Sequence, residues 1–189
     1  MTEVADQLSN TYGRRIRGIV CDIALLGHVN QMQGEVDRVD VLINNAGLEY
    51  ATPVTDPSDH VDEVFRRIIE INVIGTYSVT RMLIDRIPDG GRIVNTASMW
   101  GKTAVAEFSA YCDSKHAVIG LTRSLAQELA HRRISVNAVC PGWVRTAASM
   151  RSLSFMAAQQ QRTEADLLDE IVSAQALAGF MELKDMVDV

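Results

Sequence analysis

Residues 39–47 read Val-Asp-Val-Leu-Ile-Asn-Asn-Ala-Gly, a short apolar run closed by two asparagines, an alanine and a glycine. Three other runs of strand length end in a similar way: Ile16–Cys21 before Asp22, Arg92–Ala97 before Ser98, and Ile134–Cys140 before Pro141-Gly142. Short, β-rich, continuously apolar segments of this kind fit strands that are buried on both faces. Together with Val39–Ile43, they predict a parallel sheet.

Longer stretches between these runs show helical periodicity. Val61–Ile87 predicts either two helices or one bent helix, and Ser109–His131 predicts a helix whose final cations suit a C-terminal dipole. Strands that alternate with helices predict βαβ units and a doubly wound α/β fold. Residues 143–165 are more polar and predict a mobile loop or short helix over a pocket, with a plain surface excursion as the alternative.

The bulk composition is typical of one globular domain: 189 residues, 47% hydrophobic and 22% charged. A formal net charge of −6 argues against a nucleic-acid surface, and no apolar run approaches the roughly 20 residues that span a bilayer. Three dispersed cysteines and an N-terminus without a signal-peptide pattern favour a cytoplasmic protein with reduced thiols. The histidines and cysteines show no metal-ligand spacing, so no metal site is expected.

Tyr111 and Lys115 stand four residues apart on one predicted helix, with Ser98 at the end of a predicted strand. Side chains at this spacing lie on the same helical face. A tyrosine that exchanges protons near pH 7 needs its pKa lowered by roughly 3 units from about 10, which corresponds to about 4 kcal/mol. A neighbouring cation is the ordinary way to favour the phenolate. The three residues therefore predict an acid–base site, although the Y-x-x-x-K spacing alone is a weak signal.

Set in chain order, these segments resemble the single-domain short-chain dehydrogenase/reductase family over nearly the whole chain. The markers are Asp22 after a strand, Asn44-Asn45-Ala46-Gly47, Asn72 in a helix, Asn95-Thr96-Ala97-Ser98, Tyr111-Cys112-Asp113-Ser114-Lys115 and Pro141-Gly142-Trp143-Val144-Arg145-Thr146. Each is a modest signal, and the full set at family spacing is a specific one. The resemblance implies a Rossmann-like doubly wound parallel sheet, a homo-oligomer, and an oxidoreductase that uses NAD or NADP to interconvert a secondary alcohol and a ketone by hydride transfer.

The resemblance also implies roles for the matching residues. Tyr111 would be the general acid/base, Ser98 would hydrogen-bond the substrate oxygen, and Lys115 would lower the pKa of Tyr111 and hold the nicotinamide ribose. Asn72 would seat a water in a proton relay to Lys115, although alone it could simply satisfy a buried backbone group. Besides Tyr111 and Lys115, the implied cofactor-binding residues are Asp22 and Ile23 at the adenine end, Asn45, Ala46 and Gly47 at the adenosine ribose, and Gly142, Val144 and Thr146 at the carboxamide and phosphates.

Several features of the family pattern are missing. No T-G-x-x-x-G-x-G phosphate-binding turn occurs. Met1 falls in what resembles the helix before the third strand, and Asp188-Val189 fall in the helix before the last strand. In the family order 3-2-1-4-5-6-7, losing strands 1 and 2 leaves a gap of roughly 14 Å, because neighbouring strands lie about 4.8 Å apart. Either Ile16–Cys21 shifts to pair with Val39–Ile43, or the isolated chain holds no native sheet.

The expectation is therefore a truncated chain, weak or inactive in dinucleotide binding. Residues 1–189 would form one partial dinucleotide-binding domain, with 143–180 as a substrate-loop region. Asp113 stands where the family usually has a small apolar residue. Its carboxylate would either oppose the Tyr111 phenolate or point harmlessly away, and the second arrangement is favoured.

Three classes of function follow from these observations. The leading interpretation is the oxidoreductase with a small-molecule alcohol or ketone, and Pro-Gly-Trp-Val with Arg151 and Arg162 resembles 3-hydroxyacid or 3-oxoacyl reductases. The alternative is a catalytically silent family member that acts as a binding or assembly module. A flavodoxin- or receiver-like module is disfavoured, because the strand ends carry Asn, Ser and Pro in place of an acidic cluster or a phosphate loop.

Overall fold

The structure is a computed structural model that describes residues 2–174 and 179–186. Its centre is a three-stranded parallel sheet in the order β1-β2-β3. The strands are β1 (Val41–Asn44), β2 (Arg92–Thr96) and β3 (Ser135–Val139). Three of the four predicted strands and their parallel direction are confirmed, and their carboxyl ends meet at one edge.

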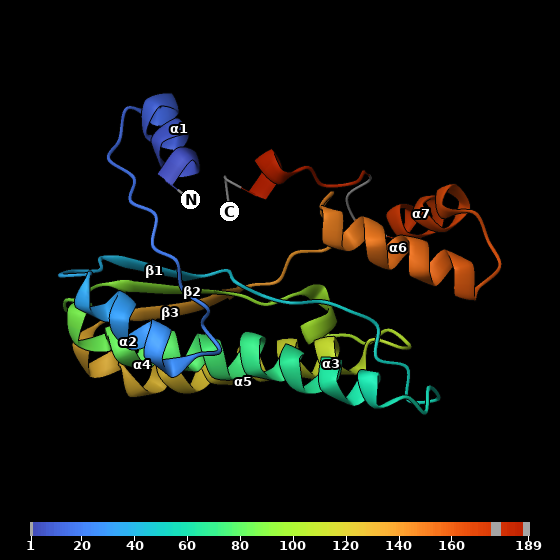
Figure 1. Cartoon of the computed structure of the whole chain (residues 1–189), viewed down its shortest axis with the longest axis horizontal. Helices are drawn as coiled ribbons and strands as arrows, with labels where there is room; N and C mark the ends of the chain where they lie inside the picture. The colour runs from blue at the N-terminus through green and yellow to red at the C-terminus, as the bar shows by residue number, and fades with distance from the viewer. Residues whose placement is uncertain (1, 175–178, 187–189) are drawn as a thin grey trace.

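One face of the sheet is covered by helices (Figure 1). These helices are α2 (Leu26–Gly34), α3 (Asp59–Ile69), α4 (Thr76–Leu83) and α5 (Ser109–Glu128). Helix α4 contacts β1 and α5 contacts β2 and β3, while α2 packs on α4 and α3 packs on α5. Leu42, Ile93 and Val136, one from each strand, are buried in the core between the layers. Removal of this apolar surface from water holds the strands and helices together.

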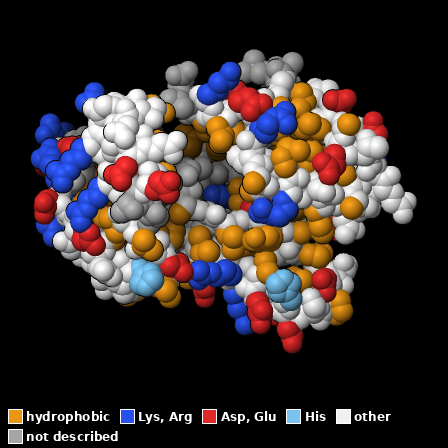
Figure 2. Space-filling view, turned by 45° about the horizontal axis from the view of Figure 1, so that its top comes forward, with side chains coloured by type: hydrophobic (Ala, Val, Ile, Leu, Met, Phe, Trp, Pro, Cys, Tyr) orange, Lys and Arg blue, Asp and Glu red, His pale blue; other side chains and the backbone are white. Residues whose placement is uncertain are grey.

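The opposite face of the sheet is open in the part of the chain that the structure describes. Val41 is 47% exposed and Ile43 is 63% exposed. Figure 2 brings this side forward and shows hydrophobic side chains around a hollow. The prediction of strands buried on both faces is wrong here, because the helices that pack against the strands, α4 and α5, lie on the other side. The α/β class and the Rossmann-like parallel sheet are confirmed.

The predicted helical stretch Val61–Ile87 forms two α-helices joined without a break. A π-helical segment, η1 (Glu70–Gly75), links α3 to α4, and a 3₁₀ turn, η2 (Ile84–Arg86), follows. Gly75 closes the π segment, and a Cβ placed there would stand 2.8 Å from the Cγ1 of Ile23. The glycine therefore allows the chain before α2 to pack directly on the widened helix.

The prediction of a strand at Ile16–Cys21 is wrong. This segment is an irregular link between α1 (Thr2–Tyr12) and the turn before α2, and its Val20 is 78% exposed. Neither expected alternative occurs, because the segment does not pair with β1 while β1 still pairs with β2. Arg17 instead donates a hydrogen bond to the backbone oxygen of Glu35 at 3.0 Å. A strand needs a neighbouring ladder for its backbone groups, and this segment has none.

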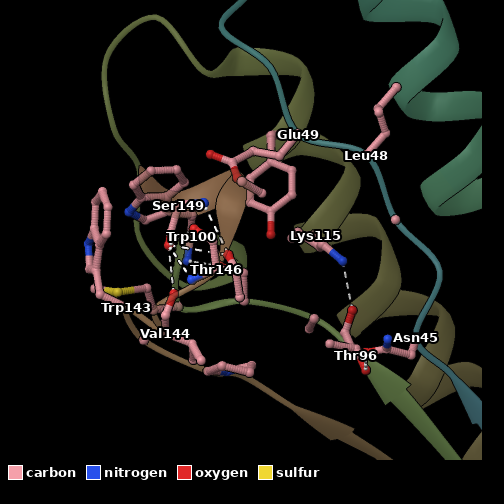
Figure 3. Close-up of a pocket in the computed structure, with 18 of the residues that line it drawn as sticks. Asn45, Leu48, Glu49, Thr96, Trp100, Lys115, Trp143, Val144, Thr146 and Ser149 are labelled. Atoms are coloured by element: carbon pink, nitrogen blue, oxygen red, sulfur yellow. Dashed lines mark hydrogen bonds between the residues drawn. The ribbon is translucent and has the colours of Figure 1, made fainter. Parts of the chain in front are cut away.

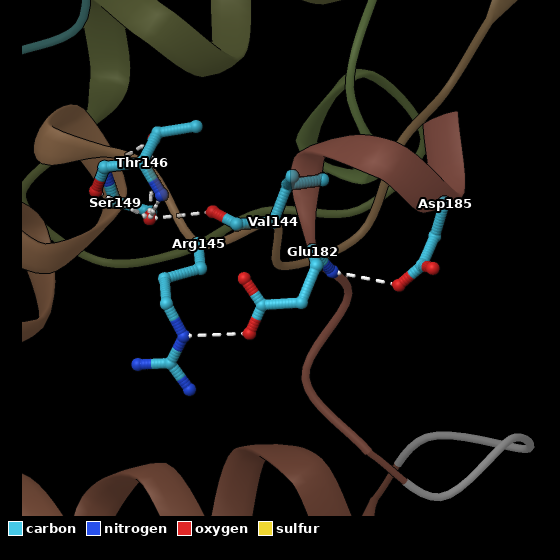
Figure 4. Close-up of polar contacts among 6 residues, drawn as sticks. All are labelled: Val144, Arg145, Thr146, Ser149, Glu182 and Asp185. Carbon is cyan, nitrogen blue, oxygen red and sulfur yellow. Dashed lines mark hydrogen bonds and ion pairs between the residues drawn. The ribbon is translucent and has the colours of Figure 1, made fainter. Parts of the chain in front are cut away.

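Residues 143–165, expected to be a loop or short helix, contain one long helix and the start of another, α6 (Ala147–Gln159) and α7 (Glu164–Ser173). Helix α6 begins with a capping box that the sequence analysis missed. The Thr146 Oγ1 accepts from the Ser149 backbone N–H, and the Thr146 N–H donates to the Ser149 Oγ, both at 3.1 Å (Figure 4). This reciprocal cap satisfies backbone donors at the first turn.

The C-terminal part returns to the start of α6. Met181 forms an isolated parallel bridge with Val144, and Arg145 pairs with Glu182 at 2.9 Å (Figure 4). The last described element is the 3₁₀ turn η5 (Leu183–Met186), and the helix expected at Asp188-Val189 lies outside the described residues. Among the described helices, none has the length and apolar character needed to cross a membrane.

Candidate active site

A cavity of about 280 Å³ opens where the strand ends, α5 and α6 meet (Figure 3). Open α/β sheets bind ligands at the carboxyl ends of their strands. The predicted site residues that line this cavity are Asn45, Gly47, Ser98, Tyr111, Lys115, Gly142, Val144 and Thr146. Residues that are far apart in the chain therefore share one cavity, as the sequence predicts.

Ser98 follows β2 and is 9% exposed. Its hydroxyl oxygen accepts the Trp100 N–H at 3.2 Å and so begins a 3₁₀ turn, η3 (Met99–Gly101). The Met99 N–H donates to the Pro141 oxygen at 2.9 Å, which fixes this turn against the chain after β3. Because the Ser98 hydroxyl accepts one bond, its own proton stays available to an oxygen in the cavity.

Tyr111 and Lys115 lie one turn apart on α5, both in the cavity wall. The Lys115 Nζ lies 5.5 Å from the centroid of the Tyr111 ring and donates to the Thr96 carbonyl at 2.7 Å (Figure 3). Lys115 is only 5% exposed. The Thr96 carbonyl at the end of β2 therefore positions the ammonium group at the strand edge.

Close packing of η3 on α5 depends on Gly101, a residue that the sequence analysis did not single out. A Cβ at Gly101 would stand 2.7 Å from the Lys115 backbone oxygen. Only glycine allows this approach without a backbone shift. Gly101 therefore sets the distance between the Ser98 turn and the helix that carries Tyr111.

Burial changes the pKa values of both titratable residues on α5. The pKa of Tyr111 is raised to about 12 by desolvation and then by the Glu49 carboxylate, while the Ser98 side chain acts in the opposite direction. The pKa of Lys115 is lowered to about 8 by desolvation, and Glu49 counteracts part of this effect. The direction at Tyr111 is opposite to the expected lowering, because desolvation by burial has the largest effect on the phenol and the Glu49 charge acts in the same direction.

Glu49 is a cavity residue that the sequence analysis missed. Its carboxylate accepts a hydrogen bond from the Ser152 hydroxyl on α6. Burial raises the pKa of Glu49, while Ser152, Arg151 and Lys115 act to lower it. One sequence signal could have identified Glu49: it closely follows Asn-Asn-Ala-Gly at the end of a predicted strand. Residues that follow a parallel strand lie at the carboxyl edge of the sheet, where ligands bind.

Asn72 lies beneath the cavity and is 1% exposed. Its Oδ1 accepts the Leu48 N–H at 2.7 Å, and its Nδ2 donates to the Leu48 oxygen and to the Ser114 Oγ, both at 2.9 Å. These contacts satisfy buried backbone groups, and the water-relay role implied by the family resemblance stays a prediction. Asn72 thereby holds the backbone between Gly47 and Glu49 against α5.

Asp22, Ile23, Ala46 and Asp113 also lie away from the cavity wall. Asp22 pairs with Arg67 at 2.8 Å, and its pKa is lowered by the Ala24 N–H and by Arg67. Ile23 packs on Gly75. Ala46 and Asp113 are exposed, so the carboxylate of Asp113 points away from Tyr111, as favoured.

The cysteines and the possible metal ligands form a further group of side chains with distinctive chemistry. Cys21, Cys112 and Cys140 are all free thiols. Within residues 2–174 and 179–186, no group of three His, Cys, Asp or Glu side chains is arranged to hold a metal ion.

The chain matches the family model described as short chain dehydrogenase over residues 1–156. It is 34% identical to D-beta-hydroxybutyrate dehydrogenase of Cupriavidus necator, covering 68% of this chain and 49% of that protein. It is 32% identical to the 3-oxoacyl-(acyl-carrier-protein) reductase of Aquifex aeolicus, covering 76% of this chain and 59% of that protein. Two other relatives are matched over 66% and 54% of their length, so the chain spans about half to two thirds of these proteins.

Solved structures with similar folds carry nicotinamide cofactors. NAD⁺-bound xylitol dehydrogenase has a TM-score of 0.86 and 27% identity, with 98% of this chain and 74% of that one covered. An actinorhodin polyketide ketoreductase variant with NADPH has a TM-score of 0.85 and 29% identity over the same shares. The strand-end cavity, its Ser98, Tyr111 and Lys115, and the family match over most of the sequence lead to one conclusion: this chain belongs to the short-chain dehydrogenase family.

Proposed function

We propose that this chain carries the catalytic half of an NAD(P)-dependent oxidoreductase that interconverts a secondary alcohol and a ketone. The observation that carries the proposal is the single cavity shared by Ser98, Tyr111 and Lys115. A hydroxyl donor, a phenol and an ammonium group around one space suit proton transfer to a carbonyl oxygen. The names of the relatives, a 3-oxoacyl reductase and a hydroxybutyrate dehydrogenase among them, support the same class of reaction.

In this proposal Ser98 donates a hydrogen bond to the substrate oxygen and fixes its position. Tyr111, protonated at neutral pH because its pKa is about 12, gives its proton to that oxygen as negative charge develops there. Lys115 stabilises the resulting phenolate from the same helical face. The protonated phenol is the form that ketone reduction uses, whereas alcohol oxidation uses the phenolate.

The residues at the strand edge fit the nicotinamide ribose of a bound cofactor. The Lys115 ammonium makes one hydrogen bond to protein within the described residues, to Thr96, so further N–H groups are available. A Cβ at Gly47 would stand 3.6 Å from the Lys115 Nζ, an ordinary contact distance, so the chain at Gly47 borders the ammonium group directly. The nicotinamide, when bound, supplies or accepts the hydride.

The other cofactor-binding residues that the family resemblance implies are supported to different degrees by their positions relative to the cavity. Gly142, Val144 and Thr146 line the cavity and suit the carboxamide and phosphate end. Asp22 and Ile23 lie outside the cavity wall, and the sequence holds no glycine-rich phosphate turn. Residues 143–180 fit a substrate-loop region, because Ala148, Ser149 and Arg151 of α6 form part of the wall. Homo-oligomer formation and a cytoplasmic location remain predictions from the family pattern and the cysteines.

Two measurements on the purified chain test the proposal. Isothermal titration with NADH and NADPH measures cofactor binding, and the absorbance of reduced nicotinamide follows turnover of a panel of ketones. We expect weak cofactor binding, because the sequence holds no glycine-rich phosphate turn, and we expect Tyr111→Phe to abolish any turnover that is measured. Turnover that survives Tyr111→Phe contradicts the role of the phenol. Absent cofactor binding in a chain that light scattering shows to assemble supports instead the silent binding or assembly module.

A further inference from the structure

The end of the cavity away from the strand edge carries a carboxylate. Figure 3 shows Asn45 and Thr96 at one end of the cavity, Glu49 at the other, and Lys115 between them. The first end is where the cofactor ribose belongs in the proposed function. The Glu49 end therefore faces the substrate.

Glu49 is held in place by contacts on both sides of its peptide. Asn72 binds the N–H and oxygen of the preceding Leu48, as described above. Arg151 donates to the Glu49 backbone oxygen at 3.2 Å and stacks over the Tyr50 ring at 4.7 Å. Since both flanks are anchored, the carboxylate is a fixed part of the wall and not a freely moving surface group.

One oxygen of this carboxylate is left for a ligand. The Ser152 hydroxyl, 4% exposed, donates to Oε1. No donor in residues 2–174 and 179–186 reaches Oε2. A carboxylate oxygen without a partner in a partly buried site gains most from a hydroxyl or ammonium donor of the ligand.

The surrounding wall strengthens the same preference. Trp100 and Trp143 line the cavity with their rings 5.7 Å apart at 86°, and Trp100 and Tyr111 are 5.9 Å apart at the same angle. Aromatic faces attract cations, and these rings line the same cavity as Glu49. A substrate carboxylate at this end would meet the charge of Glu49 in a poorly solvated space.

We infer that Glu49 is a specificity-determining residue that selects ketones or alcohols with a hydroxyl or protonated amine on the second carbon from the reacting carbon, and that rejects those with a carboxylate at that position. This inference rests on the proposed function for the reaction itself. It differs from the 3-hydroxyacid substrates suggested by the sequence, because the Glu49 carboxylate lies at this end of the cavity and Arg162 pairs with Glu170 outside the wall.

Binding of three methyl ketones to the chain without cofactor tests the inference. The ketones share a four-carbon skeleton whose terminal carbon bears a hydroxyl, bears an ammonium or is a carboxylate. The protein's two tryptophans, 100 and 143, both line the cavity, so intrinsic fluorescence reports binding directly. For the natural chain at pH 8, we expect the ammonium ketone to bind most tightly, then the hydroxyl ketone, and the carboxylate ketone last.

Glu49→Gln keeps the size and the Ser152 contact but removes the charge. We expect this substitution to lower the affinity for the ammonium ketone by about tenfold and to raise the affinity for the carboxylate ketone by about fivefold. Glu49→Asp should keep the original order, and circular dichroism checks that each variant is folded. Glu63→Gln, an exposed residue on α3, makes the same change in net charge and should alter none of the three affinities.

Affinities for the ammonium and carboxylate ketones that Glu49→Gln leaves unchanged overturn the inference, as does a natural chain that binds none of the ketones. These outcomes are separate from the reaction, because no cofactor is present and Tyr111→Phe is not expected to change the order. A chain that sorts the ketones but reduces none keeps the inference and rejects the proposed activity. A chain that reduces the carboxylate ketone faster than the other two supports the proposed activity and rejects the inference about Glu49.

Discussion

Two regions of the molecule differ in how far their side chains are buried. The covered region is the helix-covered sheet face together with the cavity at its edge. The open region is the other sheet face together with residues 13–25. In the covered region Ile93 is fully buried and Lys115 finds an acceptor at Thr96. In the open region Ile43 is 63% exposed and Val20 is 78% exposed. Residues of the same type therefore meet very different surroundings, and matched substitutions in the two regions measure what those surroundings contribute.

The largest difference is expected between two tyrosines. Tyr111→Phe should lower ketone turnover by roughly 10²–10⁴, because a positioned acid contributes about that factor. Tyr77→Phe removes the same hydroxyl from a residue on α4 that is 47% exposed, and should leave turnover unchanged. Initial rates with saturating cofactor compare the two. Similar losses in both variants would mean that the fold, and not the proton, was affected.

Two isoleucines on neighbouring strands compare the two faces. Ile93→Ala should lower the free energy of unfolding by about 2–5 kcal/mol, since it leaves a cavity in the core. Ile43→Ala, on the open face, should change it by less than about 0.5 kcal/mol. Urea unfolding followed by circular dichroism measures both. A large cost at Ile43 would show that something covers the open face in solution.

Substitution by alanine should have opposite effects on stability at two glycines, one packed against α5 and one within it. Gly101→Ala should cost about 1–3 kcal/mol of stability, because its Cβ would press on the Lys115 backbone. Gly120, within α5, has no atom near its Cβ position, so Gly120→Ala should stabilise the chain by about 0.5–1 kcal/mol. The same unfolding measurement serves for both. Stabilisation by Gly101→Ala would mean that η3 does not pack closely on α5.

The smallest effect is a change of stability with pH. The pKa of Lys115 is about 8 in the folded chain, against an ordinary value of 10.5. Between these values only the unfolded chain binds the proton, so stability should rise with pH. Below about pH 8 both states are protonated, and the cost of the buried charge is constant.

The comparison variants isolate this effect. Relative to Lys115→Met, the natural chain should gain roughly 2 kcal/mol between pH 8 and pH 10. Lys102→Met removes an exposed lysine and should show no such change. A flat difference for Lys115→Met would mean that water reaches the ammonium group more freely than its burial indicates.

Much of the covered region could be predicted from local patterns. The apolar runs Val39–Ile43, Arg92–Ala97 and Ile134–Cys140 predict the three strands, and the spacing of Tyr111 and Lys115 predicts a shared helical face. Such patterns work where the chain itself supplies the neighbours. Ile16–Cys21 has an equally apolar pattern but no adjacent ladder, so its propensity had nothing to stabilise it.

Other parts of the site could not be predicted, because they depend on distances between elements. Glu49 looks like an ordinary loop residue until α6 brings Ser152 to its carboxylate. Gly101 shows its role only against the Lys115 backbone. The pKa of Tyr111 depends on how deeply the ring is buried, which overrides the effect expected from its neighbour in sequence.

The sequence by itself determined the parallel strands, the helices between them and the grouping of Ser98, Tyr111 and Lys115 at one edge, because hydrophobic periodicity and helical spacing are local properties. Only the tertiary structure decided which sheet face is covered, which strand does not form, and which charge faces the substrate end. These features arise from burial and from contacts between distant segments, and both depend on where the surrounding elements come to rest.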